Sequence, residues 1–457
     1  MSSDDKLVLI VLAVLLCINM VQAYFMGLAH DEAYYWVYSK YLDWGYFDHP
    51  PLTAPAVGAG YWLIPNELGV RLVFLIMLTV SLWWMWKLTD RRDAALFVTL
   101  ILSFGLFQIV AILATPDTPL LLFATMFFVI MRNFLKKDDL KKDDVKKDDV
   151  GPALLLGLSM ALMLYAKYHG ILVILFTVLA VPRLLKKRTF WLALATGALL
   201  FTPHIVWQVR HNFVTIAFQL GRTSVWFNAD YIIKYVTGQI GSAGVFSGLI
   251  LLYVMFVRFR SATEFDRVLK YNCIGTLAFF LLASLKGRVE ANWTIVAFVP
   301  LGIIGHRYLQ DRRRLRRTTM RLALFPIGII IVLRLLMTSP PDNLWGLRRA
   351  YEFSDWRGIT REVEDYAEGL PLTANLYQHA SSLSFYSGKV VPSLNINSRP
   401  NQFTLLGLED DLLDTPVCFV SSFEIYGSRR LQFRQGKEVY LLKGLTVREL
   451  RQRFEDR

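Results

Sequence analysis

Acidic residues and a histidine lie close together in the segment HDEAYYWVYSKYLDWGYFDHPPL. Asp31 and Glu32 are neighbours directly after an apolar run, and Asp48 and His49 stand just before two prolines. A carboxylate can take a proton from an attacking hydroxyl, and a histidine can donate to a phosphate oxygen. The same acids also fit solvated helix caps. The segment is therefore a candidate for proton transfer beside a phosphate, with capping as the alternative.

Three further short segments carry polar groups between apolar runs. They are ATPDTPL with Asp117, LYAKYHG with Lys167 and His169, and KGRVEANW with Arg288, Glu290 and Asn292. Cations stabilise the negative charge that develops on a leaving phosphate. Asp117 also fits a turn cap, and Lys167 also fits an interfacial anchor. Acids and cations in this combination indicate transfer of a group from a phosphate-linked donor.

Long apolar runs separate these polar segments. The chain has 54% hydrophobic residues, 14% aromatic residues and a mean hydropathy of +0.38. A bilayer core needs about 20 apolar residues per helix, and such runs recur until about residue 338. We therefore predict an all-α polytopic membrane domain over residues 1–338, with about 11 transmembrane helices.

Basic residues fall mainly on alternate turns between the apolar runs, from Lys87, Arg91 and Arg92 to the DRRRLRRTTMR segment. Because cytoplasmic loops carry the excess of Lys and Arg, the N-terminus is predicted to be cytoplasmic. The four polar segments then lie on the outer face of the inner membrane, the first of them in an outer loop at residues 29–66. The net charge of +13 serves membrane topology in this interpretation, so no nucleic-acid partner is expected.

The remaining chain differs in composition. The repeat KKDDLKKDDVKKDDV at residues 136–150 is predicted to be a cytoplasmic charged linker without chemistry. Residues 339–457 combine an amphipathic stretch near Trp356 with the strand-like runs LTANLYQ, GKVVPSL, PVCFVSS and EVYLLKG. They predict a small C-terminal α/β domain on the periplasmic side. Three roles are open for its motif LYQHASSLSFYSGK. The motif could receive an acceptor, cover the cavity, or only stabilise the domain. The three cysteines imply no disulfide framework or zinc cluster.

The ordered set DEAYYW, YFDHPPL, ATPDTPL, AKYHG and KGRVEANW resembles the bacterial family-39 glycosyltransferases. These enzymes belong to the GT-C superfamily, with the protein O-mannosyltransferases and the lipid A aminoarabinose transferases. The resemblance covers about residues 5–310. It implies a GT-C fold and an inverting transfer from a polyprenyl-phosphate sugar donor on the non-cytoplasmic side. The implied partners are this donor, a glycolipid or protein acceptor, and the lipid bilayer.

The resemblance also implies roles for individual residues. Asp31 matches the catalytic acid of the first loop, and its neighbour Glu32 is a further catalytic candidate. Asp117 matches the acid of the second loop, which is also assigned to the active site. His49 stands where the aminoarabinose branch tends to carry a phosphate-contacting lysine, so the chain departs from that branch here. Lys167 and Arg288 are further candidates for contacts to the donor phosphate. The candidates for lining the substrate are Tyr34, Tyr35, Trp36, Asp48, His169, Glu290 and Asn292, although aromatic rings here also fit an interfacial anchor.

The expected function is therefore transfer of a sugar from a polyprenyl phosphate to lipid A, another envelope glycolipid or protein Ser/Thr. No cofactor and no metal site are predicted, and the sequence leaves dependence on a divalent metal open. The sequence contains no P-loop, Rossmann fingerprint or zincin motif. Two other functions stay open: a non-catalytic transporter or flippase of an envelope lipid, and a membrane scaffold that presents the tail as a binding module.

Overall fold

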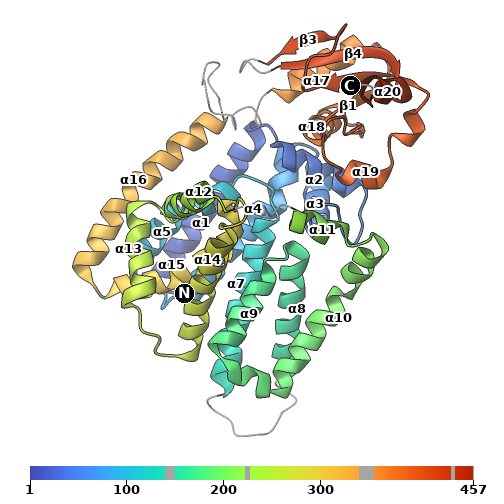
Figure 1. Ribbon diagram of the computed structural model, residues 1–457. Coiled ribbons are helices and arrows are strands. Elements are labelled where there is room, and N and C mark those ends of the chain that lie inside the picture. The colour runs from blue at the N-terminus through green and yellow to red at the C-terminus, as the bar shows by residue number, and fades with distance from the viewer. Residues whose placement is uncertain (139–149, 222–226, 339–354, 434–437, 456–457) are drawn as a thin grey trace. The chain divides into compact units, whose positions relative to one another are not determined.

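The computed structural model describes residues 1–138, 150–221, 227–338, 355–433 and 438–455. Helices dominate these residues, and one small sheet lies in the last part of the chain (Figure 1). The chain divides into two compact units. Unit 1 comprises Met1–Met20, His49–Thr53 and Val73–Val332, and unit 2 comprises Val21–Asp48, Ala54–Leu72 and Leu333–Arg457. Unit 2 thus combines much of the first loop with the tail, which differs from the predicted boundary at residue 338.

Unit 1 consists of helices, and Figure 1 shows α7 to α10 running side by side. Its helices are α1 (Ser3–Phe25), α4 (Glu67–Leu88), α5 (Ala94–Ser103), α6 (Gly105–Val110), α7 (Asp117–Asp138), α8 (Val150–Ala166), α9 (Gly170–Ala180), η2 (Pro182–Lys186), α10 (Arg188–Arg210), α11 (Val214–Gly221), α12 (Ala229–Ser242), α13 (Phe246–Tyr253), η3 (Val254–Arg258), α14 (Glu264–Ala283), η4 (Ala291–Thr294), α15 (Ile295–Gln310) and α16 (Arg313–Thr338). The boundary between the two units falls inside each of the helices α1, α4 and α16, so one end of each helix is counted in unit 2.

Five of the described helices are long and apolar enough to cross a membrane, namely Ser3–Phe25, Glu67–Leu88, Asp117–Lys136, Arg188–Arg210 and Arg313–Thr338. The pair α12 and α13 would make a sixth span, but it bends by 98° at its break. Gly244 and Val245 cause this break, since their φ angles of 97° and 50° do not fit a continuous α-helix. The predicted count of about 11 spans is therefore not confirmed.

Glycine allows α8 and α10 to approach each other closely. A Cβ atom on Gly157 would lie 2.4 Å from the carbonyl oxygen of Ala193, and one on Gly197 would lie 3.2 Å from the carbonyl oxygen of Gly157. Small residues at such contacts let helix backbones pack tightly inside a membrane. Because α8 ends at Ala166, this contact also places the residues that follow it, beginning with Lys167, beside α10.

Unit 2 contains helices and a four-stranded sheet, shown in orange to red in Figure 1 for the residues of the tail. Its helices are α2 (His30–Lys40), α3 (Thr53–Leu63), α17 (Trp356–Ala367), α18 (Tyr377–Ser387), α19 (Gln402–Leu406), η6 (Asp410–Leu412) and α20 (Val447–Glu455). The strands are β1 (Leu372–Ala374), β2 (Pro416–Ser421), β3 (Arg429–Gln432) and β4 (Glu438–Thr446). The strand order is β1-β2-β4-β3. Strand β1 pairs with β2 in parallel, and the other two pairs are antiparallel.

The α/β character predicted for the tail is present in unit 2. Three predicted strands correspond to β1, β2 and β4, and the amphipathic stretch corresponds to α17. The run GKVVPSL is not a strand, since it contributes only an isolated bridge between Ser393 and Ala374, and β3 was not predicted. Helix α18 packs against α2, so the LYQHASSLSFYSGK motif lies against the first loop. Residues 139–149 of the predicted linker lie outside the described residues.

Candidate functional site

Asp117 begins α7, and its carboxylate lies between two other predicted site residues. The Nζ atom of Lys167 is 2.8 Å from Oδ1, and the amide Nδ2 of Asn292 donates to Oδ2 at 2.6 Å. Asp117 is 2% exposed and Lys167 is 8% exposed. The structure thus joins the segments ATPDTPL, AKYHG and KGRVEANW into one cluster, which we call the Asp117 cluster.

The burial of this cluster decides what it can do. A buried charge is costly unless a partner compensates it, and Asp117 and Lys167 compensate each other. The start of a helix also favours a carboxylate. An ammonium group carries three N–H donors, and the bond to Asp117 uses one of them. The cluster therefore holds a cation in a fixed position, suited to contact with a further anion.

His169 lies in the turn between α8 and α9, close to this cluster. Its ring packs against the rings of Phe280 and Trp293, with centroids 4.9 Å and 5.2 Å away. Burial, and then the positive charges of Lys167 and His49, lower the pKa of His169 well below its usual range. The imidazole is therefore neutral near pH 7 and offers hydrogen bonding, not a positive charge. The same interaction places His49 in the neighbourhood of His169.

Tyr168 connects the same turn to α10 and α11 through hydrogen bonds. Its hydroxyl oxygen is 2.7 Å from Nε2 of His204 and accepts a hydrogen bond from Gln208 at 2.9 Å. Gln208 also donates to the hydroxyl of Thr215 at 2.7 Å. His204, Gln208 and Thr215 are buried, so this polar network limits the movement of the turn that carries Lys167 and His169. No local pattern in the sequence marks Gln208 or Thr215.

Arg288 and Glu290 do not join the Asp117 cluster. Nε of Arg288 lies 2.9 Å from Oε1 of Glu290, and the Arg288 side chain is 62% exposed. An exposed pair of this kind is weakly held. The charge of Arg288 is solvated and paired locally, and its contact to the donor phosphate stays a prediction. Of the three predicted site residues in KGRVEANW, Asn292 is the one that donates to Asp117.

Glu32, in unit 2, is held by a buried arginine. Arg71 donates through Nε to Oε1 at 2.7 Å and through Nη2 to Oε2 at 2.5 Å, and the Ala29 N–H donates to Oε2 at 2.9 Å. The remaining N–H groups of Arg71 donate to the carbonyl oxygens of Ala23, Met26 and Gly27. A proton on Glu32 would leave the buried Arg71 charge uncompensated. Glu32 is thus a buried partner of Arg71 within unit 2, and its catalytic role stays a prediction.

Asp31 has a different environment, although it is the next residue along α2. Its side chain is exposed, and Oδ1 accepts a long hydrogen bond of 3.4 Å from the hydroxyl of Tyr377. Successive residues of an α-helix point about 100° apart, so one of the two acids faces the interior and the other faces solvent. Of the two, Asp31 is the acid that a substrate can reach.

Asp48 pairs with an arginine from the tail. Arg399 donates to Oδ1 of Asp48 from Nη1 at 3.2 Å and to Oδ2 from Nη2 at 3.4 Å. Its guanidinium also lies over the ring of Tyr377, 5.0 Å from the centroid. The sequence missed Arg399, because no local pattern marks an ion pair between residues this far apart. Tyr377 was contained in the LYQHASSLSFYSGK motif, but nothing distinguished it there.

The aromatic residues predicted as anchor or lining pack inside unit 2. The ring of Tyr34 is 4.7 Å from that of Tyr377, and its hydroxyl accepts a 2.6 Å hydrogen bond from the Gln402 N–H. Trp36 packs against Phe385 at 5.5 Å, and Tyr35 is also buried. These rings form the contact between α2 and the tail residues. Burial among protein side chains does not fit an interfacial anchor, and the substrate-lining role of Tyr34, Tyr35 and Trp36 stays a prediction.

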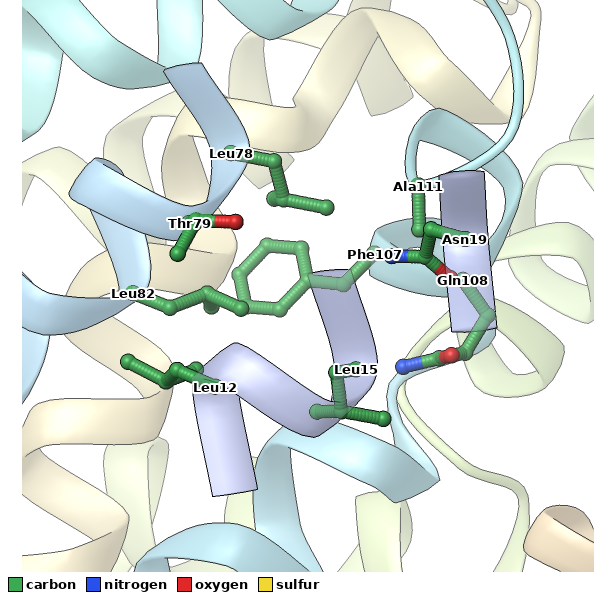
Figure 2. Close-up of a pocket in the computed structure, with 9 residues that line it drawn as sticks. All are labelled: Leu12, Leu15, Asn19, Leu78, Thr79, Leu82, Phe107, Gln108 and Ala111. Atoms are coloured by element: carbon green, nitrogen blue, oxygen red, sulfur yellow. The ribbon is translucent and has the colours of Figure 1, made fainter. Parts of the chain in front are cut away.

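Figure 2 shows a cavity elsewhere in unit 1, between α1, α4 and the α6 region. Its residues are mostly apolar, including Leu12, Leu78 and Phe107, with Asn19 and Gln108 as the amides. Its volume of about 20 Å³ holds roughly one water molecule, so it is too small for a sugar or a lipid. Within the residues that the structure describes, no three His, Cys, Asp or Glu side chains gather to hold a metal ion.

Comparison with known proteins places the chain among membrane glycosyltransferases. Residues 48–207 match the family of dolichyl-phosphate-mannose-protein mannosyltransferases. The lipid A galacturonosyltransferase RgtD of Rhizobium johnstonii is 22% identical over 334 residues, which are 68% of this chain and 67% of RgtD. The crystal structure of ArnT from Cupriavidus metallidurans in the apo state superimposes with a TM-score of 0.67 at 15% identity, over 96% of this chain and 98% of ArnT. The matched family and the shared ArnT-type fold agree with the resemblance to GT-C glycosyltransferases.

A second ArnT structure, bound to undecaprenyl phosphate, matches this GT-C chain with a TM-score of 0.68 at 16% identity, over the same shares of 96% and 98%. The predicted family is therefore confirmed, and the chain has the mostly helical ArnT-type membrane fold with a small sheet. It is a membrane glycosyltransferase. The roles of individual residues are not decided by these similarities.

Proposed function

We propose that this GT-C glycosyltransferase moves a sugar from a polyprenyl-phosphate donor to lipid A or another envelope glycolipid, on the outer face of the inner membrane and with inversion. The observation that carries the proposal is the Asp117 cluster, in which an ion pair and an amide hold Lys167 in a buried position. The ArnT structure that contains undecaprenyl phosphate supports the donor, and the lipid A galacturonosyltransferase supports the acceptor.

Unit 1 binds the donor phosphate in this proposal. Lys167 keeps one N–H on Asp117 and directs the others to the phosphate oxygens, where they stabilise the charge that develops as the sugar leaves. Asn292 fixes the second oxygen of Asp117, so the carboxylate cannot swing away from Lys167. His49 and the neutral His169 supply further hydrogen bonds. Asp117 thus acts by positioning Lys167, and its carboxylate does not take the acceptor proton.

Asp31 acts on the acceptor. It takes the proton of the attacking hydroxyl as the new bond forms between that oxygen and the anomeric carbon. The bond from the anomeric carbon to the phosphate oxygen breaks, and its electron pair leaves with the polyprenyl phosphate. A single displacement of this kind inverts the anomeric centre. When the acceptor is itself a phosphate, no base is needed, and Asp31 instead orients the acceptor or stabilises an oxocarbenium-like centre.

The acceptor can be tested by mass spectrometry of cells with and without the gene. Lipid A, other envelope glycans and periplasmic glycoproteins are analysed from the wild type, a deletion strain and a deletion strain that expresses Asp31→Asn. We expect one sugar mass in the lipid A or glycolipid fraction of the wild type only. A difference confined to glycoproteins would replace the acceptor by protein Ser/Thr. No difference in any fraction would contradict the transferase proposal.

A further inference from the structure

Two segments of the tail reach the acids of the first loop within unit 2. Asp48 pairs with Arg399, Arg399 lies over the ring of Tyr377, and the Tyr377 hydroxyl donates to Asp31. Asp31 and Asp48 are thus joined through two residues that follow them by more than 300 positions in the chain. The LYQHASSLSFYSGK motif, which had no assigned role, supplies the residue that touches Asp31.

Two of the arginines in unit 2, Arg71 and Arg399, hold acids of the first loop in different ways. Arg71 is fully buried and holds Glu32 with bonds of 2.5 Å and 2.7 Å. Arg399 is 38% exposed at its side chain and holds Asp48 with bonds of 3.2 Å and 3.4 Å. Charge-assisted bonds of this kind are usually about 2.7–2.9 Å long. The Arg71 pair is therefore a rigid part of the fold, while the Arg399 link can tighten or shift.

Tyr377 is the central residue of the link. Its ring contacts Tyr34 at 4.7 Å and lies under the Arg399 guanidinium, so the ring position is fixed on both sides. Burial, and then the negative charge of Asp31, raise the pKa of Tyr377 above its usual range. The phenol therefore stays protonated at physiological pH and can only donate to the carboxylate.

We propose that Tyr377 is a positioning residue for Asp31, and that Arg399 and Asp48 hold Tyr377 in place for this task. The inference rests on the proposed function, in which Asp31 acts on the acceptor. A hydrogen bond to a catalytic group is often long before substrate binds and tightens in the reactive complex. Donation to Oδ1 fixes the direction of the whole carboxylate. In this proposal the tail contributes a positioning residue to the site that contains Asp31.

Replacement of Tyr377 by phenylalanine in the full-length protein tests this role. The ring and its packing stay, and only the hydroxyl is lost. Sugar transfer from a polyprenyl-phosphate sugar to lipid A is measured with purified protein in detergent, and kcat and KM are determined for both substrates. We expect kcat to fall about 10- to 100-fold, because a hydrogen bond to a charged group is lost, with both KM values within about twofold.

Tyr426→Phe is the matched control, because Tyr426 belongs to the same unit and is 86% exposed; its kcat should equal that of the wild type. Arg399→Lys keeps the positive charge but loses the paired hydrogen bonds to the two oxygens of Asp48. Its kcat should therefore lie between those of the wild type and Arg399→Gln. An unchanged kcat in Tyr377→Phe, or a loss that lies only in KM, overturns the inference.

A double variant separates this inference from the proposed function. In Asp31→Glu the carboxylate is displaced. Adding Tyr377→Phe to this variant should therefore lower kcat by a smaller factor than Tyr377→Phe does in the wild type. Losses that simply multiply would show that Tyr377 acts elsewhere. If Asp31→Asn is inactive while Tyr377→Phe is fully active, only the positioning role fails. If Asp31→Asn is fully active, the proposed function itself fails, and the positioning role fails with it.

Discussion

Asp31 in unit 2 and Asp117 in unit 1 are both acids in the first turn of a helix, but their surroundings differ. Asp117 is buried between the ammonium of Lys167 and the amide of Asn292, with bonds of 2.8 Å and 2.6 Å. Asp31 is exposed and accepts a 3.4 Å bond from Tyr377. A helix start favours a carboxylate in either place. The tertiary partners then decide whether the acid holds another group or meets a substrate.

The comparison teaches that an acid is not catalytic merely because it is close to cations. Asp117 can give up its charge only by leaving a buried lysine uncompensated, and the same holds for Glu32 and Arg71. Asp31 is instead exposed to solvent and accepts a long hydrogen bond from Tyr377. We therefore expect substitutions at Asp31 to affect turnover, and substitutions at the buried pairs to affect folding or donor binding.

Asp31→Asn should have the largest effect. The variant keeps the size of the side chain at an exposed position, so the protein should express and fold normally. Loss of a proton acceptor lowers turnover by about 10²–10⁴-fold, measured as sugar transfer per mole of purified protein. Size-exclusion chromatography in detergent checks the fold. Turnover close to that of the wild type would contradict the expected difference in role between Asp31 and Asp117.

Glu32→Gln should lower the folding stability of the protein more than its turnover. The change leaves the buried Arg71 without its counter-charge, which costs about 3–5 kcal/mol of folding stability. We expect a lower yield and a lower Tm, while the protein that does fold keeps much of its turnover. A variant with normal Tm and no activity would instead return Glu32 to the reaction, as the sequence suggested.

Lys167→Met should reduce donor binding. It removes the cation from the Asp117 cluster and leaves a buried carboxylate, so Asp117→Asn combined with Lys167→Met is needed to restore the charge balance. We expect this double variant to recover expression but to bind the polyprenyl-phosphate donor about 10–100-fold more weakly, the loss of a charge-assisted contact. Donor binding in detergent measures this directly. Donor affinity equal to that of the wild type would exclude Lys167 as the phosphate contact.

Arg288→Gln should have the smallest effect. The pair with Glu290 is exposed, and such pairs contribute about 0–1 kcal/mol. We expect donor affinity and turnover to stay within about threefold of the wild type. A loss as large as that of the Lys167 variant would mean that Arg288 enters the site when the donor binds.

Charge and hydropathy in the sequence predicted the membrane class and the segments that carry the polar groups, and the resemblance of the ordered motifs implied the family. Asp117, Lys167 and Asn292 were all predicted as site residues, and the structure joins them. Their proximity could be expected because apolar runs bring alternate turns to the same side of a membrane, while their roles stay predictions. The number of spans was less predictable, since a turn such as Gly244 and Val245 breaks a run that composition alone reads as continuous.

The sequence by itself determined that Asp31 and Glu32 stand side by side, and it gave both the same role. Only the tertiary structure separated them, because neighbouring helical residues face different directions and Arg71 approaches one of the two. The same holds for Tyr377 and Arg399, which reach the first loop from the tail. Contacts between distant segments leave no local pattern in a chain, so the partners that set the role of each acid become visible only when the chain is folded.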